Sequence, residues 1–295
     1  MFLFYIKKNK FIIVIFIIIS IVIGATQAFT SFFYFNNNNN LKVANAPLKD
    51  GFQEIQKDNL IIKNNKENKK PEIKPKFYLI IDDVGYDEFM LEQFIKLNLE
   101  INYAIIPFLP KSTILYKKLK NNNKTIIIHF PMQSKHRNSI EKFHINIEDK
   151  KEEIHKKIEK TFKMYPDAKI MNNHMGSLIT SNKDLMKIIL IKLKEIERYF
   201  FDSVTIAGSI PETVGKEIGV KVEKRDVFLD SKDTEKSVLK ELEKAKNIAR
   251  KHGIVKVIGH IWSKNTLKVL EKEESNLNQE FEFDNLLNLY EETIR

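Results

Sequence analysis

From residue 77 onward, short apolar runs alternate along the chain with longer amphipathic stretches. The apolar runs have the length and continuity of strands that are buried on both faces, and they lie at residues 77–81, 101–106, 125–128, 169–171, 199–201, 227–229 and 254–258. Most of the intervening stretches have the apolar spacing of helices, at residues 88–97, 112–120, 150–164, 183–196, 234–252 and 265–273. In one of them Leu239, Leu242, Ala245 and Ala249 form a single apolar stripe. The alternation predicts an α/β domain on a parallel sheet or barrel of about seven strands.

The first 35 residues have a different pattern, which predicts a targeting segment. Lys7, Lys8 and Lys10 precede an almost uniformly apolar run at 11–23, and a weaker stretch at 24–35 extends it. A membrane-spanning helix needs roughly 20 apolar residues, and basic residues favour keeping its N-terminal end in the cytoplasm. We therefore predict an N-terminal hydrophobic helix at 1–35 that acts as a signal anchor, with a cleaved signal peptide as the alternative. In either case the remainder is expected outside the cytoplasm, in the periplasm or cell envelope.

Residues 36–75 are rich in Asn and Lys and lack periodicity, so we predict a disordered polar linker, followed by a folded domain at 76–295. The net charge of +10 comes largely from residues 1–75, which hold 11 Lys against 5 Asp and Glu. Later in the chain Lys and Glu are interleaved, as on a solvated helix face. The charge therefore gives no concentrated basic face and argues against nucleic acid as a partner. The absence of cysteine excludes disulfides and thiolate-bound zinc.

Polar side chains collect immediately after or beside the predicted strands. They are Asp82, Asp83, His129, Asn172, Asn173, His174, Arg225, Asp226 and His260. The carboxyl ends of parallel strands meet on one face of such a domain, where ligands bind. We therefore expect these residues to converge on one site.

The chemistry of this set suggests a divalent metal site with acid–base groups beside it. Asp83, His129 and His174 would supply a carboxylate and two imidazoles, a donor set that suits a divalent metal, most simply zinc. Asp82 could then act as a base, although two Asp before a helix could also include its N-cap. His260 could donate a proton, or it could simply cap the following loop. An isolated His at a strand end is more often structural than catalytic, so the prediction depends on convergence.

The motifs occur in the same order as in a known family. They are IIDDVGYD (80–87), IPFLP (106–110), HFPMQ (129–133), NNHMGS (172–177), FFDS (200–203), RDVFLD (225–230) and IGH (258–260). Over roughly residues 76–283 the chain thus resembles the divergent polysaccharide deacetylases. The resemblance implies a deformed (β/α) barrel and metal-assisted removal of acetyl groups from a polysaccharide. It also implies that Asp82 is the base, Asp83 a metal ligand and His260 the acid.

The sequence departs from the usual deacetylase pattern at one metal ligand. Those enzymes take two His from one short motif, whereas here Gln133 stands four residues after His129. We predict that His174 replaces the missing ligand, with His136 as a weaker substitute. Asn172 and Asn173 would orient the ligands. Asp226 could orient His260 or another site group, and Arg225 could hold an anionic or hydroxylated substrate.

Three functions remain open on this basis. The first is a metal-dependent hydrolase that removes N- or O-acetyl groups from an envelope glycan. The second is a non-catalytic glycan-binding or structural protein of the envelope, and the third is hydrolysis of another ester or phosphoester. The sequence has no glycine-rich phosphate loop, so a nucleotide is not expected as a ligand.

Overall fold

The structure, a computed structural model, describes residues 74–135 and 141–291. The predicted anchor at 1–35 and all but the last two residues of the predicted linker lie outside these ranges. Within the described part of the chain, no helix has the length and apolar character needed to cross a bilayer.

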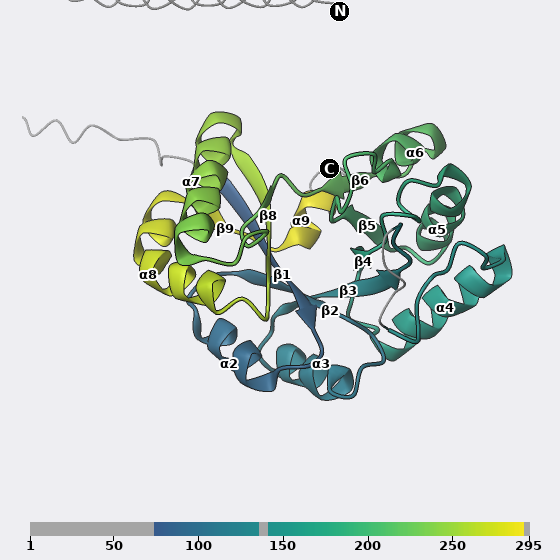
Figure 1. The fold of residues 1–295 in the computed structure, drawn as a ribbon, viewed down its shortest axis with the longest axis horizontal. Coiled ribbons are helices and arrows are strands. Elements are labelled where there is room, and N and C mark those ends of the chain that lie inside the picture. Colours follow the sequence, from purple (N-terminus) through teal and green to yellow (C-terminus); the bar gives the residue numbers. More distant parts are fainter. Residues whose placement is uncertain (1–73, 136–140, 292–295) are drawn as a thin grey trace, which may run out of the picture. The chain divides into compact units, whose positions relative to one another are not determined.

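The described residues form a strongly curved, all-parallel sheet (Figure 1). Its strands are β1 (Lys76–Val84), β2 (Ile101–Ile105), β3 (Thr125–Met132), β4 (Ile170–Met175), β5 (Tyr199–Asp202), β6 (Val222–Lys224), β7 (Val227–Phe228), β8 (Ile254–His260) and β9 (Glu282–Phe283). Eight of them follow the order β6-β5-β4-β3-β2-β1-β8-β7, and β9 pairs with the start of β1. This arrangement is the deformed α/β barrel expected from the sequence, open between β6 and β7.

Arg225 and Asp226 lie in the two-residue gap between the open edges of the sheet. The backbone N–H of Arg225 donates to the carbonyl of Asp202 in β5, and that of Asp226 donates to the carbonyl of Lys256 in β8. The Asp226 carboxylate accepts a hydrogen bond of 2.8 Å from the N–H of Lys256. This dipeptide therefore connects the two edges and satisfies backbone groups that an open barrel would leave unpaired.

Helices cover the convex side of the sheet (Figure 1). They are α2 (Glu88–Lys96), α3 (Ser112–Asn121), α4 (Lys151–Met164), α5 (Lys183–Glu195), α6 (Pro211–Ile218), α7 (Glu235–His252) and α8 (Lys264–Glu280). A final short helix, α9 (Leu286–Glu291), lies on the concave side. Side-chain caps begin several of these helices. In α2 the cap is Asp87, which accepts from the N–H of Met90 at 3.0 Å. The alternative role of the Asp82-Asp83 pair as a helix cap is therefore wrong.

The sequence missed four elements, β6, β9, α6 and α9. These strands have two or three residues, too few for a periodic pattern to be detected. In α7 the apolar stripe contains Val238, which is fully buried, in place of the predicted Leu239, which is 41% exposed.

Two apolar clusters lie on opposite sides of the sheet. The larger joins the outer helices to the convex face of the strands. The smaller contains inward-facing strand residues, among them Tyr78, Ile80 and Ile127, together with Leu286 and Tyr290 of α9. The hydroxyl of Tyr290 donates to the carbonyl of Phe200 at 2.7 Å. Thus α9 fills the concave side of the barrel near the amino-terminal ends of the strands, and the opposite end remains available for a site.

Candidate active site

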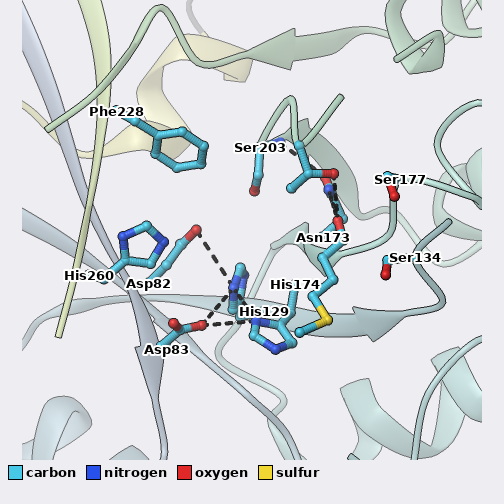
Figure 2. A pocket seen from close by; sticks show the side chains of 12 residues that line it. Asp82, Asp83, His129, Ser134, Asn173, His174, Ser177, Ser203, Phe228 and His260 are labelled. Atoms are coloured by element: carbon cyan, nitrogen blue, oxygen red, sulfur yellow. Dashed lines mark hydrogen bonds and ion pairs between the residues drawn. The ribbon is translucent and has the colours of Figure 1, made fainter. Parts of the chain in front are cut away.

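The predicted site residues occupy the next inward-facing positions above this inner core. Side chains in a strand alternate between faces, so residues two apart share a face. Asp82 follows Ile80, His129 follows Ile127, and His260 follows Ile258 at this spacing. On β4, Asn172 and then His174 follow Ile170. The carboxyl ends of four strands therefore direct polar groups into one cleft (Figure 2).

A backbone irregularity brings the adjacent residues Asp82 and Asp83 to the same cleft. In a regular strand their side chains would point to opposite faces. The pairing of β1 with β2 shifts register between Ile81 and Val84, and Asp83 has a left-handed φ of 66°. A bulge of this kind changes the direction of a side chain. It turns the Asp83 carboxylate toward the cleft that Asp82 already faces.

Asp83, His129 and His174 form a compact group with the geometry of a metal site. Asp83 Oδ1 lies 3.2 Å from His129 Nε2 and 2.9 Å from His174 Nδ1. The two imidazole nitrogens are 3.2 Å apart. Zinc–ligand bonds of about 2.0–2.2 Å would place three ligand atoms at such separations. Among the described residues these three form a cluster that could hold a metal ion.

The donor atoms of this cluster fit a divalent cation. Asp83 Oδ1 is buried and has no hydrogen-bond partner, although it faces both imidazoles. Burial would raise the pKa of Asp83, but His129 and His174 hold it well below its usual value. His129 can donate from Nδ1 to Asn172 Oδ1 at 2.8 Å, which leaves Nε2 free to ligate. Two imidazoles and one carboxylate leave a position open, as in catalytic zinc sites.

His174 contacts a second carboxylate that sequence analysis did not identify. Its Nε2 lies 3.5 Å from Oε1 of the buried Glu141, on the side of the ring away from Asp83. Tyr86 donates its hydroxyl to the same oxygen at 3.3 Å. Burial would lower the pKa of His174, but Asp83 and Glu141 raise it to about 10. Glu141 follows no strand, so no sequence pattern indicated it.

Asn172 connects Asp82 to the cluster of Asp83, His129 and His174. Its Nδ2 donates to Asp82 Oδ1 at 2.9 Å, and its Oδ1 faces His129 Nδ1. Asp82 Oδ2 is 3.7 Å from His129 Nε2. Burial raises the pKa of Asp82, although His129 and His260 partly oppose this effect. One amide thus orients the carboxylate and the imidazole together.

His260 lies on the opposite side of the cleft, and Asp230 orients it. Asp230 Oδ1 is 2.6 Å from His260 Nδ1, and Oδ2 accepts from the His260 backbone N–H at 2.8 Å. Thr266 donates a further hydrogen bond to Oδ2 at 2.8 Å. Burial would lower the pKa of His260, but Asp230, together with Asp83 and Asp82, raises it to about 9. An imidazole with this pKa is protonated at neutral pH.

The prediction that Asp226 orients His260 is therefore wrong. Asp226 is exposed and holds the edge of β8, and Asp230, the last residue of the same RDVFLD motif, contacts the imidazole. The guanidinium of Arg225 is engaged by the backbone of the protein. Its Nε donates to the carbonyl of Ser203 and its Nη2 donates to that of Val204, both at 2.7 Å. Its guanidinium stacks at 3.6 Å over the ring of Phe228. It supports the wall of the cleft by these contacts.

The side chains of Asn173 and Gln133 make hydrogen bonds to backbone groups of neighbouring segments. The Asn173 amide donates to the Met175 carbonyl at 2.8 Å and accepts from the Ser203 N–H at 3.0 Å, so it fixes the turns after β4 and β5. Gln133 Oε1 accepts from the N–H of Ile147 at 2.9 Å. His136 lies outside the described residues. Of the two substitutes considered for the missing ligand, His174 lies in the cluster.

The cleft has a volume of about 350 Å³, at the small end of ligand pockets. Around this cleft, Figure 2 shows the side chains of Asp83, His129, His174 and His260, together with Phe228, Ser203, Ser177 and Ser134. Ser203 Oγ is buried without a hydrogen-bond partner. Asp83, Met175 and Val204, which lie in or beside this cleft, all have left-handed backbones. Such conformations cost free energy and concentrate at functional sites.

Known proteins resemble this chain in sequence. Residues 79–289 match the family described as divergent polysaccharide deacetylase. An uncharacterized protein of Haemophilus influenzae Rd is 32% identical over 215 residues, which cover 73% of this chain and 76% of the relative. The uncharacterized protein YibQ of Escherichia coli K12 is 32% identical over 207 residues, 70% of this chain and 65% of the relative.

A solved structure shows the same fold. The crystal structure of an uncharacterized protein from Agrobacterium tumefaciens C58 superposes with a TM-score of 0.66 at 14% identity. The match covers 72% of this chain and 88% of that protein. At this identity the similarity concerns the fold alone.

Proposed function

This chain belongs to the divergent polysaccharide deacetylase family, and we propose that it is a metal-dependent hydrolase that removes acetyl groups from a polysaccharide of the cell envelope. One observation carries the proposal. A cluster suited to a metal, a buried carboxylate and an Asp-oriented imidazole face the same small cleft. The hydrophobic segment at 11–23 supports a place outside the cytoplasm.

Asp83, His129 and His174 would hold the divalent cation, for which zinc fits the donors best. Such a cation supplies a Lewis acid that polarises an acetyl carbonyl and lowers the pKa of water. Asp82 would accept the proton from the attacking water, and its raised pKa makes it a stronger base than an exposed Asp. The hydrogen bond from Asn172 leaves Oδ2 as the oxygen free to accept this proton.

His260 would protonate the departing group from the other side of the cleft. Asp230 holds Nδ1, so Nε2 is the nitrogen available to donate. For an N-acetyl group the departing group is an amine, and for an O-acetyl group it is an alcohol. Both gain the proton from His260 as the bond to the acetyl carbon breaks, and Asp82 and His260 exchange protons with solvent before the next turnover.

The test combines metal analysis with acetate release. The full-length protein, purified in detergent, should contain near-stoichiometric zinc and should release acetate from an acetylated glycan such as an N-acetylglucosamine pentamer or peptidoglycan fragments. Asp82→Asn should retain zinc but lose about 10²–10⁴-fold in rate, because it removes the base and keeps the size of the side chain. His174→Ala should lose both zinc and activity.

Two outcomes would overturn the proposal. One is wild-type protein that takes up no metal even when zinc is added back. The other is zinc-loaded protein that binds the glycan but releases no acetate, which would favour the non-catalytic glycan-binding alternative.

A further inference from the structure

Trp262 lies beside the cleft, two residues beyond the end of β8, and 49% of the residue is exposed. It is the only tryptophan in the chain. Large aromatic residues are usually well buried. A Trp that stays half exposed beside the cleft is therefore a candidate for contact with a ligand.

The indole is held in place on two sides. Its Nε1–H donates to Oδ2 of Asp83 at 2.9 Å. One face of the ring stacks on the imidazole of His260, with centroids 5.0 Å apart and the planes inclined by 21°. These contacts fix the ring in one orientation before any ligand binds. Because these contacts hold the ring while 49% of the residue stays exposed, little side-chain entropy would be lost when a ligand stacks on it.

The cleft itself is too small for a polymer. Its volume of about 350 Å³ lies at the small end of ligand pockets, so only a short part of a glycan fits inside. A polysaccharide chain must therefore continue over the rim. Trp262 contacts two residues that line the cleft, Asp83 and His260, so it lies at the rim on the side of the proposed acid.

The acidic residues and the absence of Lys and Arg among the described residues that line the cleft disfavour an anionic glycan. Although the chain has a net charge of +10, the lining residues in the described ranges include no Lys or Arg. The nearby Arg225 donates to two backbone carbonyls and stacks on Phe228. Ser203, Ser177 and Thr205 line the wall with hydroxyl groups, which suit sugar hydroxyls and amides.

We propose that Trp262 is a preformed stacking platform for a neutral sugar ring, adjacent to the sugar whose acetyl group enters the cleft. The apolar C–H face of a pyranose matches an indole in size and polarity, and stacking on an aromatic face requires no charge on the ligand. This inference rests on the proposed function, because it assigns the neighbouring subsite of the same glycan.

Because Trp262 is the only tryptophan in the chain, its fluorescence can report ligand binding at this position. When the zinc-loaded full-length protein is titrated with an N-acetylglucosamine pentamer, the fluorescence of Trp262 should change saturably. An oligogalacturonate of equal length, which is anionic, should bind at least tenfold more weakly. No change with the pentamer, or equal binding of both sugars, would overturn the platform for a neutral glycan.

Variants separate stacking from the contact with Asp83. Trp262→Ala removes the ring and the N–H, whereas Trp262→Phe retains a ring but removes the N–H. If the platform exists, Trp262→Ala should lower kcat/KM about tenfold more for the pentamer than for the N-acetylglucosamine monomer. Trp262→Phe should keep most of the preference for the pentamer. Phe89→Ala, which removes an aromatic ring from a residue that is 67% exposed on α2, should leave both substrates unaffected.

The results distinguish this inference from the proposed function. Equal losses on pentamer and monomer, reproduced by Trp262→Phe, would show that Trp262 acts only by positioning Asp83 and would overturn the platform. If the wild type released no acetate but the pentamer still changed its fluorescence, and calorimetry showed weaker pentamer binding to Trp262→Ala, the platform would stand and the hydrolase would fail.

Discussion

At the residue scale, the two carboxylates and two of the imidazoles in the cleft have pKa values that their surroundings shift from the ordinary ones. Asp82 and Asp83 are adjacent in sequence but have opposite pKa shifts, because burial dominates at Asp82 while two imidazoles surround Asp83. His174 and His260 each have a raised pKa from carboxylates that face them. Environments that separate pKa values in this way assign the base and the acid in many hydrolases.

The first residue-scale prediction concerns pH. The His260 acid must be protonated, so kcat/KM should fall as the pH rises through about 9. Asp230→Asn removes the charge that raises this pKa, while burial still lowers it. The alkaline limb of the pH profile should therefore move to lower pH, with at least about a tenfold loss of rate at pH 8. Asp233→Asn, a matched change at a carboxylate that instead contacts Ser263, should leave the limb in place. An unshifted limb in Asp230→Asn would exclude His260 as the acid.

At the element scale, the turns after the strands determine where the site residues point. The bulge in β1 redirects Asp83, and β4 leads into its turn through its last residue, Met175, and then Gly176, both left-handed. A Cβ on Gly176 would lie 3.0 Å from Met132 Cβ in the adjacent strand, so this turn approaches β3 closely. His174 precedes the turn by one residue. Its orientation therefore depends on the turn as well as on the strand.

Gly176→Ala tests this dependence. The left-handed conformation and the contact with Met132 should together lower the free energy of unfolding by about 2 kcal/mol. The same change should weaken zinc binding, measured by chelator competition, because His174 shifts. Gly219→Ala provides the control, since Gly219 is also left-handed but a Cβ there would meet no atom within 4 Å. It should lose about 1 kcal/mol and keep its zinc affinity. Equal zinc affinity in both variants would contradict the role of the turn.

At the scale of the whole domain, apolar packing closes one end of the barrel, and the candidate site occupies the other end. The helix α9 and the inner apolar cluster close one end, and the polar residues at the strand ends form the cleft at the other. The backbone of Arg225 and Asp226 connects the open edges. The position of the site thus depends on a core that the last described residues of the chain complete.

Leu286→Ala measures how much α9 contributes. Leu286 is fully buried in the inner cluster, so truncation should cost about 2–5 kcal/mol in chemical denaturation. Leu287→Ala, at a neighbouring and only partly buried residue, should cost clearly less. Equal costs would mean that α9 does not seal the barrel as the structure indicates.

The sequence by itself determined the alternation of strands and helices and the set of polar residues at the strand ends. These features follow from local periodicity and from the rule that parallel strands end on one face. Asp82, Asp83, His129, His174 and His260 do converge, as that rule predicted. The family resemblance of the ordered motifs was likewise evident in the sequence.

Only the tertiary structure decided which groups touch. It selected Asp230 over Asp226 for His260, added Glu141 and Trp262 to the site, and turned Asp83 toward Asp82 through a bulge. It also placed α9 inside the barrel. These outcomes depend on register, backbone irregularity and contacts between residues far apart in the chain, such as Trp262 and Asp83, which are 179 positions apart. Local periodicity carries no information on such contacts, because they arise only when separate elements pack.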